Sequence, residues 1–482
     1  MSEKVAPFKV FPRLGLPELE ARARGAQKLI EAVRNASLEP NLTKVLRTFP
    51  ATEIVRYLGN ISIDTLYRRL KKDPELPQGN QVSPRRRVFT LAEIHQLQSA
   101  FGLRPKRPAG QEALVVSVCN FKGGVAKTTT SVHLAQYLTL MGLKCLAVDL
   151  DAQSSLSQSG FGLLPHTEVP PERTARVIFD GPDDPATGEP NPDWTGTLKH
   201  AIQPTHWDGL DLIASNLGLY GAEFSIASRI RAASLNNEPF LFYDVLRQGL
   251  EPLKQEYDVI LLDTAPSLSF VNSNALFAAD ALIITLPPAS LDVQSASLFF
   301  DLIHDVLSTV QSVQEFGKEY EFGGVLLTKM RPSDSTHQTI ASWIRTDLGD
   351  TFTNPMVQSV VLEKLGARVM TMYEADPVDD ATKYEGDRRA FDRAFEAMNS
   401  VNAEIEEMIQ GVWARRIAAD MPVLTEAASL ADARAASRKR VPDHSPRFIE
   451  TVAHFLLGRS KEHWLAARPM ADHADMERHA VA

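Results

Sequence analysis

The feature that most constrains this chain is an apolar run ending in a glycine-bearing turn flanked by two lysines, Val115 to Thr130. The order predicts a buried strand, a tight turn and the start of a helix. Backbone N–H groups at such a turn point into one concavity, and the helix adds the positive end of its dipole. Lys127 is placed to reach terminal phosphates, and the Thr128 hydroxyl to ligate Mg²⁺. The segment therefore predicts a site for a magnesium-bound polyphosphate.

A further lysine, Lys122, stands ahead of the glycine pair, where an ordinary phosphate-binding loop does not require one. This extra cation suggests that one subunit reaches across to the nucleotide of its partner. The strict loop formula expects glycine where the chain has Phe121 and Ala126, and the Cβ of Ala126 predicts that the loop avoids positive φ there. The residues expected to cradle the polyphosphate are Lys122, Gly123, Gly124, Val125, Ala126, Lys127, Thr128 and Thr129.

Two further apolar runs end in acids. Residues 144–153 close on Asp149 and Asp151, and residues 257–266 close on Asp263. Such runs are typical of a parallel sheet, whose strands are buried on both faces and bind ligands at their carboxyl ends. One acid is needed to hold the metal and another to orient the attacking water. The expected metal ligands are Thr128, Asp149 and Asp263, and the expected catalytic residues are Lys122, Lys127 and Asp151. The alternative is that the acids only cap the helices that follow.

Residues 121–130, 149–153 and 263–266 resemble the deviant Walker A box, the second acidic box and the Walker B segment of the ParA/MinD group of ATPases. Within that group the chain is most similar to the plasmid-partition ParA branch, in particular the RepA proteins of repABC-type plasmids. The resemblance covers roughly residues 45–412. Ala126 and Ala152 depart from the pattern, which usually has glycine and proline there.

The resemblance implies a mostly parallel, doubly wound α/β sheet and a weak basal ATPase that uses ATP and Mg²⁺. It also implies that ATP closes a homodimer face to face, that this dimer binds non-specific DNA, and that a ParB-type centromere-binding partner stimulates hydrolysis. In such relatives the N-terminal domain binds operator DNA and represses its own operon. The function implied is DNA segregation, or plasmid partition.

The charge of the chain is unevenly distributed. Residues 1–110 carry 20 basic and 10 acidic side chains; since the whole chain has 51 and 60, the remainder has 31 and 50. A basic N-terminal part ahead of an acidic ATPase indicates a polyanionic partner for the N-terminal part.

The basic part contains a helix-turn-helix pattern. Residues 50–58 and 62–72 predict two short helices joined by a Gly-Asn turn, with Ser62 as N-cap of the second. The second helix of such a pair lies in the major groove of DNA, and residues 77–90 predict a wing. The residues expected to contact DNA are Thr65, Tyr67, Arg68, Arg69, Arg85, Arg86 and Arg87. A small helical bundle with a solvated basic face is the alternative.

These patterns divide the chain into four expected parts. They are an N-terminal helical arm (1–42), a winged helix-turn-helix domain (43–105), a ParA-type ATPase domain (106–415) and a partly helical or disordered C-terminal extension (416–482). The Pro- and Gly-rich residues 165–196 predict a surface loop and no core helix. Because the chain has no apolar run of about 20 residues and no signal-peptide pattern, we expect a cytoplasmic, nucleoid-associated protein that does not bind membranes.

Three other functions fit parts of the sequence. A MinD-like membrane ATPase needs a C-terminal amphipathic helix, for which residues 445–467 are a candidate, but it leaves the basic N-terminal part unexplained. A redox ATPase such as the nitrogenase iron protein needs cysteines on loops, whereas Cys119 and Cys145 lie in predicted strands. A repressor without ATPase activity is the third, if Ala126 disables the loop.

Overall fold

The computed structural model describes residues 15–38, 43–84, 86–103, 107–163, 168–182, 189, 191, 194–313, 317–376 and 388–420. Its centre is a seven-stranded sheet with the order β10-β9-β4-β8-β5-β7-β6. Neighbouring strands run parallel, except that β6 is antiparallel to β7. The strands are β4 (Leu114–Cys119), β5 (Cys145–Leu150), β6 (Ile202–Pro204), β7 (Leu210–Ile213), β8 (Val259–Thr264), β9 (Ala281–Leu286) and β10 (Phe322–Leu327). The expected fold class is therefore confirmed.

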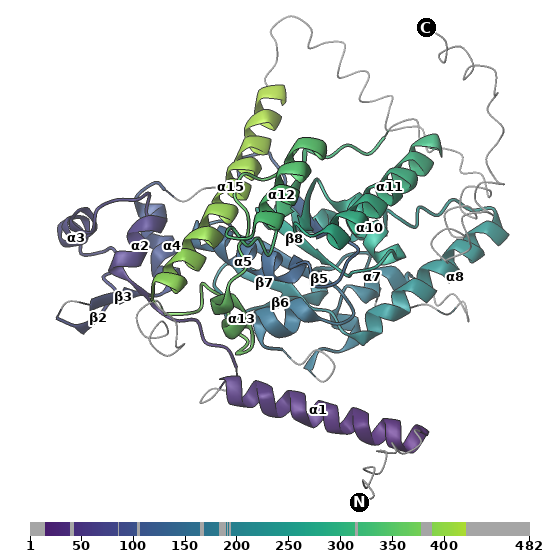
Figure 1. The fold of residues 1–482 in the computed structure, drawn as a ribbon, viewed down its shortest axis with the longest axis horizontal. Helices are drawn as coiled ribbons and strands as arrows, with labels where there is room; N and C mark the ends of the chain where they lie inside the picture. Colours follow the sequence, from purple (N-terminus) through teal and green to yellow (C-terminus); the bar gives the residue numbers. More distant parts are fainter. Residues whose placement is uncertain are drawn as a thin grey trace, which may run out of the picture.

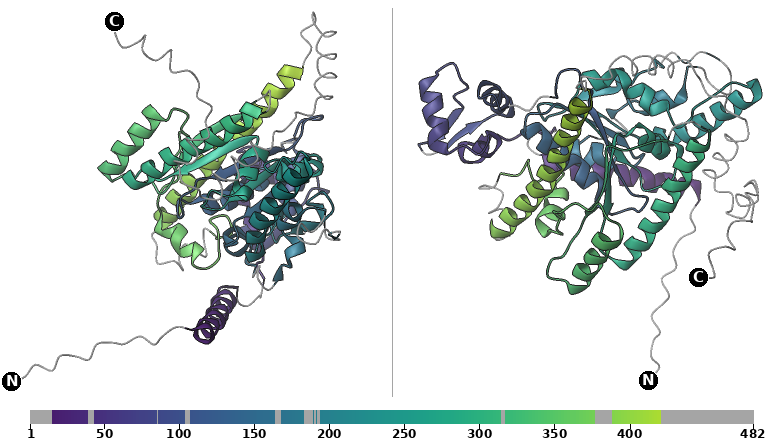
Figure 2. Two further views of the ribbon diagram at one scale, coloured as in Figure 1. Left: turned by 90° about the vertical axis from the view of Figure 1, so that its right-hand side faces the viewer. Right: turned by 90° about the horizontal axis from the view of Figure 1, so that it is seen from above.

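Helices cover both faces of this sheet (Figure 1, Figure 2). Alternate residues of a strand point to opposite faces, so Val116 and Val118 of β4 pack with α5 (Lys127–Leu140) and α15 (Arg388–Asp420), whereas Val115 packs with the opposite helices. Those helices are α7 (Arg176–Asp180), α8 (Tyr220–Asn236), α9 (Val245–Leu250) and α10 (Phe270–Ala278). A third apolar cluster joins α11 (Ser290–Val313) and α12 (Ser335–Asp347) to β9 and β10.

The expectation of a surface loop without a core helix over residues 165–196 is wrong. Within that stretch α7 buries Val177, Ile178 and Phe179 against α8 and α9. Five helical residues are too few to give a periodic signal, and the surrounding prolines and glycines dominate the pattern. The other short helical elements are η1 (Leu156–Gly160), η2 (Pro171–Arg173), η3 (Lys199–Ala201), η4 (Leu217–Leu219), η5 (Glu251–Gln255) and α13 (Val360–Gly366).

The N-terminal domain has the winged helix-turn-helix form. Its elements are β1 (Phe49–Pro50), α2 (Ala51–Tyr57), α3 (Ile63–Lys72), β2 (Asn80–Ser83), β3 (Arg86–Phe89) and α4 (Leu91–Ala100), with an antiparallel sheet in the order β1-β3-β2. Gly59 and Asn60, with φ of 75° and 54°, make the turn between α2 and α3. The Ser62 and Thr90 hydroxyls cap α3 and α4, which fixes where each helix begins.

This domain packs on the large sheet through a shared core. Phe49, Ile54 and Leu97 belong to the same apolar cluster as the buried residues of α5 and α15. Polar contacts fix how α4 is oriented against the end of α5. His95 Nε2 lies 2.8 Å from the carbonyl oxygen of Thr139, and Gln98 Nε2 donates to the carbonyl oxygen of Leu140 at 2.8 Å. As a result α4 faces the sheet and α3 lies on the outer side of the domain (Figure 1).

The first helix, α1 (Leu16–Leu38), is held to the molecule near its C-terminal end. Arg34 donates to the carbonyl oxygen of Gly162 at 2.8 Å and lies 3.0 Å from Glu168. Most of the helix is exposed, including apolar side chains such as Leu16 and Leu29. Among the described helices, α1 included, none is long and apolar enough to cross a bilayer.

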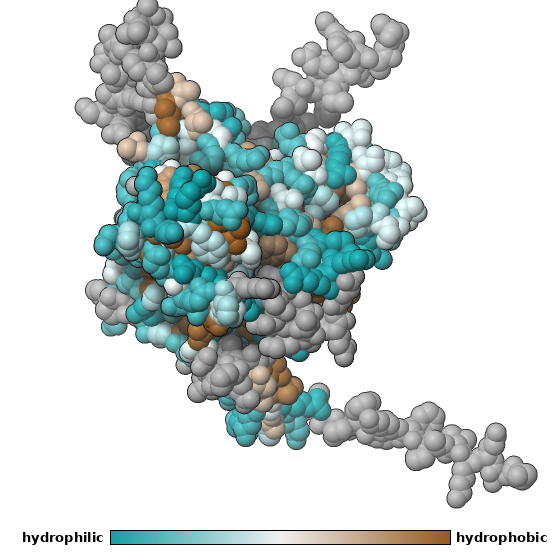
Figure 3. Space-filling model, turned by 90° about the vertical axis from the view of Figure 1, so that its left-hand side faces the viewer, coloured by the Kyte–Doolittle hydropathy of each residue, from teal (hydrophilic) through white to brown (hydrophobic). Residues whose placement is uncertain are grey.

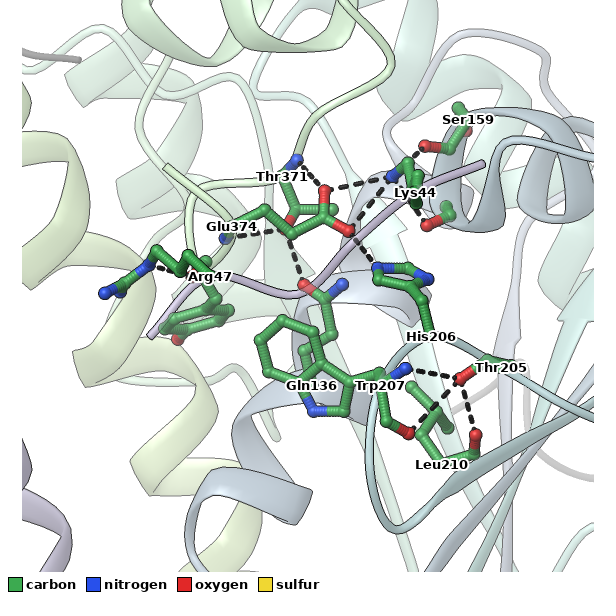
Figure 4. Close-up of polar contacts among 12 residues, drawn as sticks. Lys44, Arg47, Gln136, Ser159, Thr205, His206, Trp207, Leu210, Thr371 and Glu374 are labelled. Carbon is green, nitrogen blue, oxygen red and sulfur yellow. Dashed lines mark hydrogen bonds and ion pairs between the residues drawn. The ribbon is translucent and has the colours of Figure 1, made fainter. Parts of the chain in front are cut away.

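A buried ionic cluster ties the segment before β1 to the seven-stranded domain (Figure 4). The Glu374 carboxylate accepts from Lys44 Nζ at 2.9 Å and from the Thr371 amide at 2.8 Å, and lies 2.6 Å from His206 Nε2. Lys44 also donates to the carbonyl oxygen of Gly160 at 2.8 Å. Burial raises the pKa of Glu374, but Lys44 and His206 outweigh that effect and lower the pKa to about 2. The carboxylate is therefore charged at neutral pH.

We expect Glu374→Gln to lower the free energy of unfolding by about 3–5 kcal/mol, because it leaves the Lys44 ammonium buried without its counter-charge. The folded carboxyl has a pKa below the ordinary value of 4.5, so its contribution is present above about pH 4.5 and is lost as the pH falls toward 2. Urea unfolding at pH 7 and at about pH 3.5 measures the free energy of unfolding of the unmodified protein and of Glu374→Gln. The difference in this free energy between the two proteins should be smaller at the lower pH.

The matched control is Glu20→Gln, which removes an exposed ion pair with Arg24 and should cost under about 0.5 kcal/mol. Equal costs for the two variants would contradict a structural role for the buried cluster.

Candidate nucleotide site and DNA interface

A cavity of about 590 Å³ opens at the carboxyl ends of the central strands. Its walls include the loop from Gly123 to Thr129, Asp151 after β5 and Pro266 after β8. A cavity of this size suits a nucleotide, and its place at the strand ends is the usual one for ligands of parallel sheets. The remaining lining residues are Val132, His133, Gln153, Ser155, Ser159, Lys329, Leu362, Gly366, Met370 and Thr371.

The phosphate loop adopts positive φ at Ala126, so the expectation that it avoids this conformation is wrong. Ala126 has φ 68° and ψ 27° and is the N-cap of α5, and Gly124 before it has φ 74°. Hydrogen bonds hold the turn, since the Ala126 carbonyl oxygen accepts from the Thr130 amide at 3.0 Å and from its hydroxyl at 2.8 Å. An alanine in this region costs about 1–2 kcal/mol, so the surrounding contacts impose the geometry.

The two lysines of the loop lie in different places. Lys127 lines the cavity, and its Nζ donates to the carbonyl oxygen of Lys122 at 3.0 Å. Burial lowers the pKa of Lys127, and the nearby carboxylates of Asp263 and Asp151 oppose this shift. Lys122 is not among the lining residues; its ammonium lies 2.8 Å from Asp292 on α11.

Two buried acids lie side by side beneath the loop. Asp149 of β5 and Asp263 of β8 are paired in the sheet register, and both are fully buried. The Asp263 carboxylate accepts from the hydroxyls of Thr128 and Ser131, each at 2.7 Å. Burial raises the pKa of Asp263 to about 6, and burial together with the Asp263 charge raises that of Asp149 to about 8.

This donor set fits Mg²⁺ in part. Thr128 lines the cavity, and its hydroxyl donates to the buried Asp263, so two hard oxygen groups of the kind Mg²⁺ prefers lie next to each other. Asp149 is engaged elsewhere: it accepts from the Ser157 hydroxyl at 2.7 Å and from the Asp151 amide at 3.1 Å. No group of three or more His, Cys, Asp or Glu side chains suited to a metal occurs in the described part of the chain. Ligands for Mg²⁺ would therefore include phosphate oxygens and water.

Asp151 is the expected catalytic acid that reaches the cavity. It follows β5, lines the cavity wall and accepts from the Gln153 amide at 2.9 Å. Its backbone amide is bound by Asp149, so the buried acid positions the exposed one. Asp151 therefore lies in the same cavity wall as the loop from Gly123 to Thr129.

Several cavity residues were not predicted from the sequence. Ser159, Leu362 and Thr371 come from η1, α13 and the loop before α15, none of which carries a phosphate-binding pattern. Asp292 was missed as well, although it is the ionic partner of Lys122. An acid in the first turn of a helix is common and gives no signal of such a role.

The expected DNA-contacting residues are only partly brought together. Tyr67, Arg68 and Arg69 are exposed on α3, and the Arg87 guanidinium lies 5.8 Å from the Tyr67 ring, which brings wing and helix together. Arg86 instead forms an ion pair at 2.6 Å with Asp376. Thr65 lies beside Ser62 at the start of α3, and Arg85 lies outside the described residues. The face that carries α3 is largely hydrophilic (Figure 3).

Comparison with known proteins places the chain in a family. A family described as an AAA domain matches residues 113–315. The chain is 31% identical to a putative replication protein A of Sinorhizobium fredii, over 78% of this chain and 90% of that protein. It is 32% identical to a putative replication protein A of Rhizobium rhizogenes, over 86% and 98%, and 31% identical to protein SopA of Escherichia coli, over 59% and 69%.

A solved structure described as a partition protein has the same fold, with a TM-score of 0.50 and 20% identity over 77% of this chain and 99% of that one. The fold is that of an α/β P-loop protein. The chain belongs to the ParA/SopA family of plasmid-partition ATPases. The resemblance inferred from the sequence motifs is thus confirmed.

Ala126→Gly should raise the free energy of unfolding by about 0.5–1 kcal/mol, because glycine adopts positive φ without the strain of a Cβ. Urea unfolding measures the change. Ala403→Gly within α15 is the matched control and should lower the free energy of unfolding by about 1 kcal/mol, since its helical φ suits alanine better. A loss of stability in both variants would show that the loop relaxes away from positive φ in solution.

Proposed function

We propose that the chain is an ATP-dependent DNA-partition protein whose cavity binds ATP with Mg²⁺. The observation that carries this is the meeting of Lys127, Thr128 and Asp151 at one cavity of about 590 Å³, with the Thr128 hydroxyl hydrogen-bonded to the buried Asp263. The loop amides from Gly123 to Thr129 would bind phosphate oxygens, and the Lys127 ammonium would contact the β- and γ-phosphates. Bound Mg²⁺ supplies Lewis-acid stabilisation of charge on those oxygens.

In this proposal Asp151 orients the attacking water, and the buried acids act beneath it. Asp263 accepts a hydrogen bond from the Thr128 hydroxyl, which would help to hold Mg²⁺, and Asp149 holds the Asp151 backbone in place. Lys122 crosses to the nucleotide of a second subunit, so that two chains close face to face around two nucleotides. The closed homodimer then binds non-specific DNA, and a ParB-type partner stimulates hydrolysis and releases it.

The N-terminal domain would bind operator DNA and repress the operon of the chain. Support comes from its winged helix-turn-helix form and from exposed Tyr67, Arg68 and Arg69 on the outer side of α3. We place the protein in the cytoplasm, associated with the nucleoid, because its proposed partners are nucleic acid and a DNA-bound protein.

Substitutions at two cavity residues separate ATP binding from turnover. Lys127→Gln should weaken ATP binding at least tenfold by calorimetry, since it removes a charge-assisted phosphate contact worth about 1.5–3 kcal/mol. Asp151→Ala should keep ATP binding and lose most hydrolysis, because it removes only the group that orients the water. Hydrolysis is measured with and without non-specific DNA, which should stimulate the unmodified protein. Unchanged ATP affinity in Lys127→Gln would remove this lysine from the site.

The DNA-binding proposal is tested with Arg68→Ala on the exposed side of α3. If Arg68 contacts a base, we expect the free energy of operator binding to weaken by about 1–3 kcal/mol. If it contacts phosphate, we expect a smaller loss of binding free energy that is the same for all DNA sequences. Arg345→Ala, which removes an exposed arginine from α12, is the matched control and should leave operator binding unchanged. Both variants should retain ATPase activity. Equal losses of operator affinity would place the DNA interface elsewhere.

A further inference from the structure

One part of the cavity wall comes from a segment that is far from the phosphate loop in the sequence. Met370 and Thr371 line the cavity together with the loop from Gly123 to Thr129. Val369, just before them, has a φ of 56°, a conformation that β-branched side chains rarely adopt. A residue in such a conformation persists only where neighbouring contacts fix the backbone. The contacts that hold residues 369–373 therefore determine the shape of this part of the wall.

His133 of α5 makes one of these contacts. It is buried, it lines the cavity, and its Nε2 accepts from the Met372 amide at 3.0 Å. Its Nδ1 lies 2.7 Å from the carbonyl oxygen of Thr129. Because an amide N–H only donates and a carbonyl oxygen only accepts, the ring is the neutral tautomer with its proton on Nδ1. Burial favours this neutral form, since it lowers the pKa of His133 to about 4.

Two further side-chain contacts hold the same segment. Thr371 Oγ1 donates to Gln136 Oε1 at 2.6 Å, one turn along α5 from His133 (Figure 4). The Tyr373 hydroxyl donates to Asn399 Oδ1 of α15 at 3.0 Å. These two contacts attach the segment to helices, whereas His133 joins it directly to the last residue of the phosphate loop.

We propose that His133 is a positioning residue for the nucleotide, because it sets the separation between the phosphate loop and the wall formed by Met370 and Thr371. The inference rests on the proposed function, in which ATP occupies this cavity. A nucleotide between loop and wall contacts both, so a displaced wall loses contacts with it and binding weakens. Asp151 comes from the segment after β5 and orients the water in the proposed reaction. The loss should therefore appear in KM and not in kcat.

The test is ATP affinity of the full chain, measured by calorimetry in the presence of Mg²⁺, together with KM and kcat for hydrolysis. His133→Phe keeps a ring and removes both hydrogen bonds. We expect its ATP affinity to fall at least about fivefold, because a neutral hydrogen bond is worth roughly twofold to tenfold in an equilibrium constant. His133→Ala removes the same two bonds and should show the same loss, so the result does not depend on how the Phe ring packs.

His133→Gln is the conservative variant, because its side-chain oxygen can accept from the Met372 amide in place of Nε2. We expect its ATP affinity to lie within about twofold of that of the unmodified protein. His95→Phe is the matched control, since His95 is another buried histidine, with its Nε2 2.8 Å from the carbonyl oxygen of Thr139 at the C-terminal end of α5. The control should lower the thermal unfolding temperature and leave ATP affinity unchanged.

Unchanged affinity in His133→Phe and His133→Ala would overturn the inference. So would an equal loss of affinity in His95→Phe, since the cause would then be general destabilisation. A loss in His133→Gln as large as that in His133→Phe would overturn it as well, by showing that the link to Met372 does not carry the effect. Failure of the proposed function is distinguishable, because the unmodified protein would then bind no ATP at all.

Discussion

The register of β5 against β8 sets Asp149 directly beside Asp263, and the site is built around this pairing of two buried acids. Burial raises the pKa of both acids, the nearby Asp263 charge raises that of Asp149 further, and polar groups buried at such a position need hydrogen-bond donors around them. The donors are hydroxyls of Thr128 and Ser131 in α5 and of Ser157 in η1. The hydrogen bonds that satisfy the acids therefore also fix the start of α5 and the segment after β5, and with them the floor and one wall of the cavity.

Much of this arrangement could be predicted, because parallel strands leave long apolar runs that end at one edge of the sheet. The places of Asp149 and Asp263 near the ends of their strands, the helix start at Lys127 and the cap at Ser62 follow from local pattern. The positive φ of Ala126 could not be predicted, since its cause is the fixed path between β4 and α5. The ion pairs of Lys122 and Arg86 were equally hidden, because each joins residues more than 150 positions apart.

The winged domain is a continuation of the ATPase core and not a separate module. It shares apolar residues with α5 and α15, and the Glu374 cluster links the segment before it to Thr371 in the cavity wall. A ligand that shifts this wall would act on the same carboxylate that binds Lys44. Coupling between two sites is reciprocal. If DNA binding displaced the segment, it would change the affinity for the cavity ligand by the same factor by which that ligand changes the affinity for DNA.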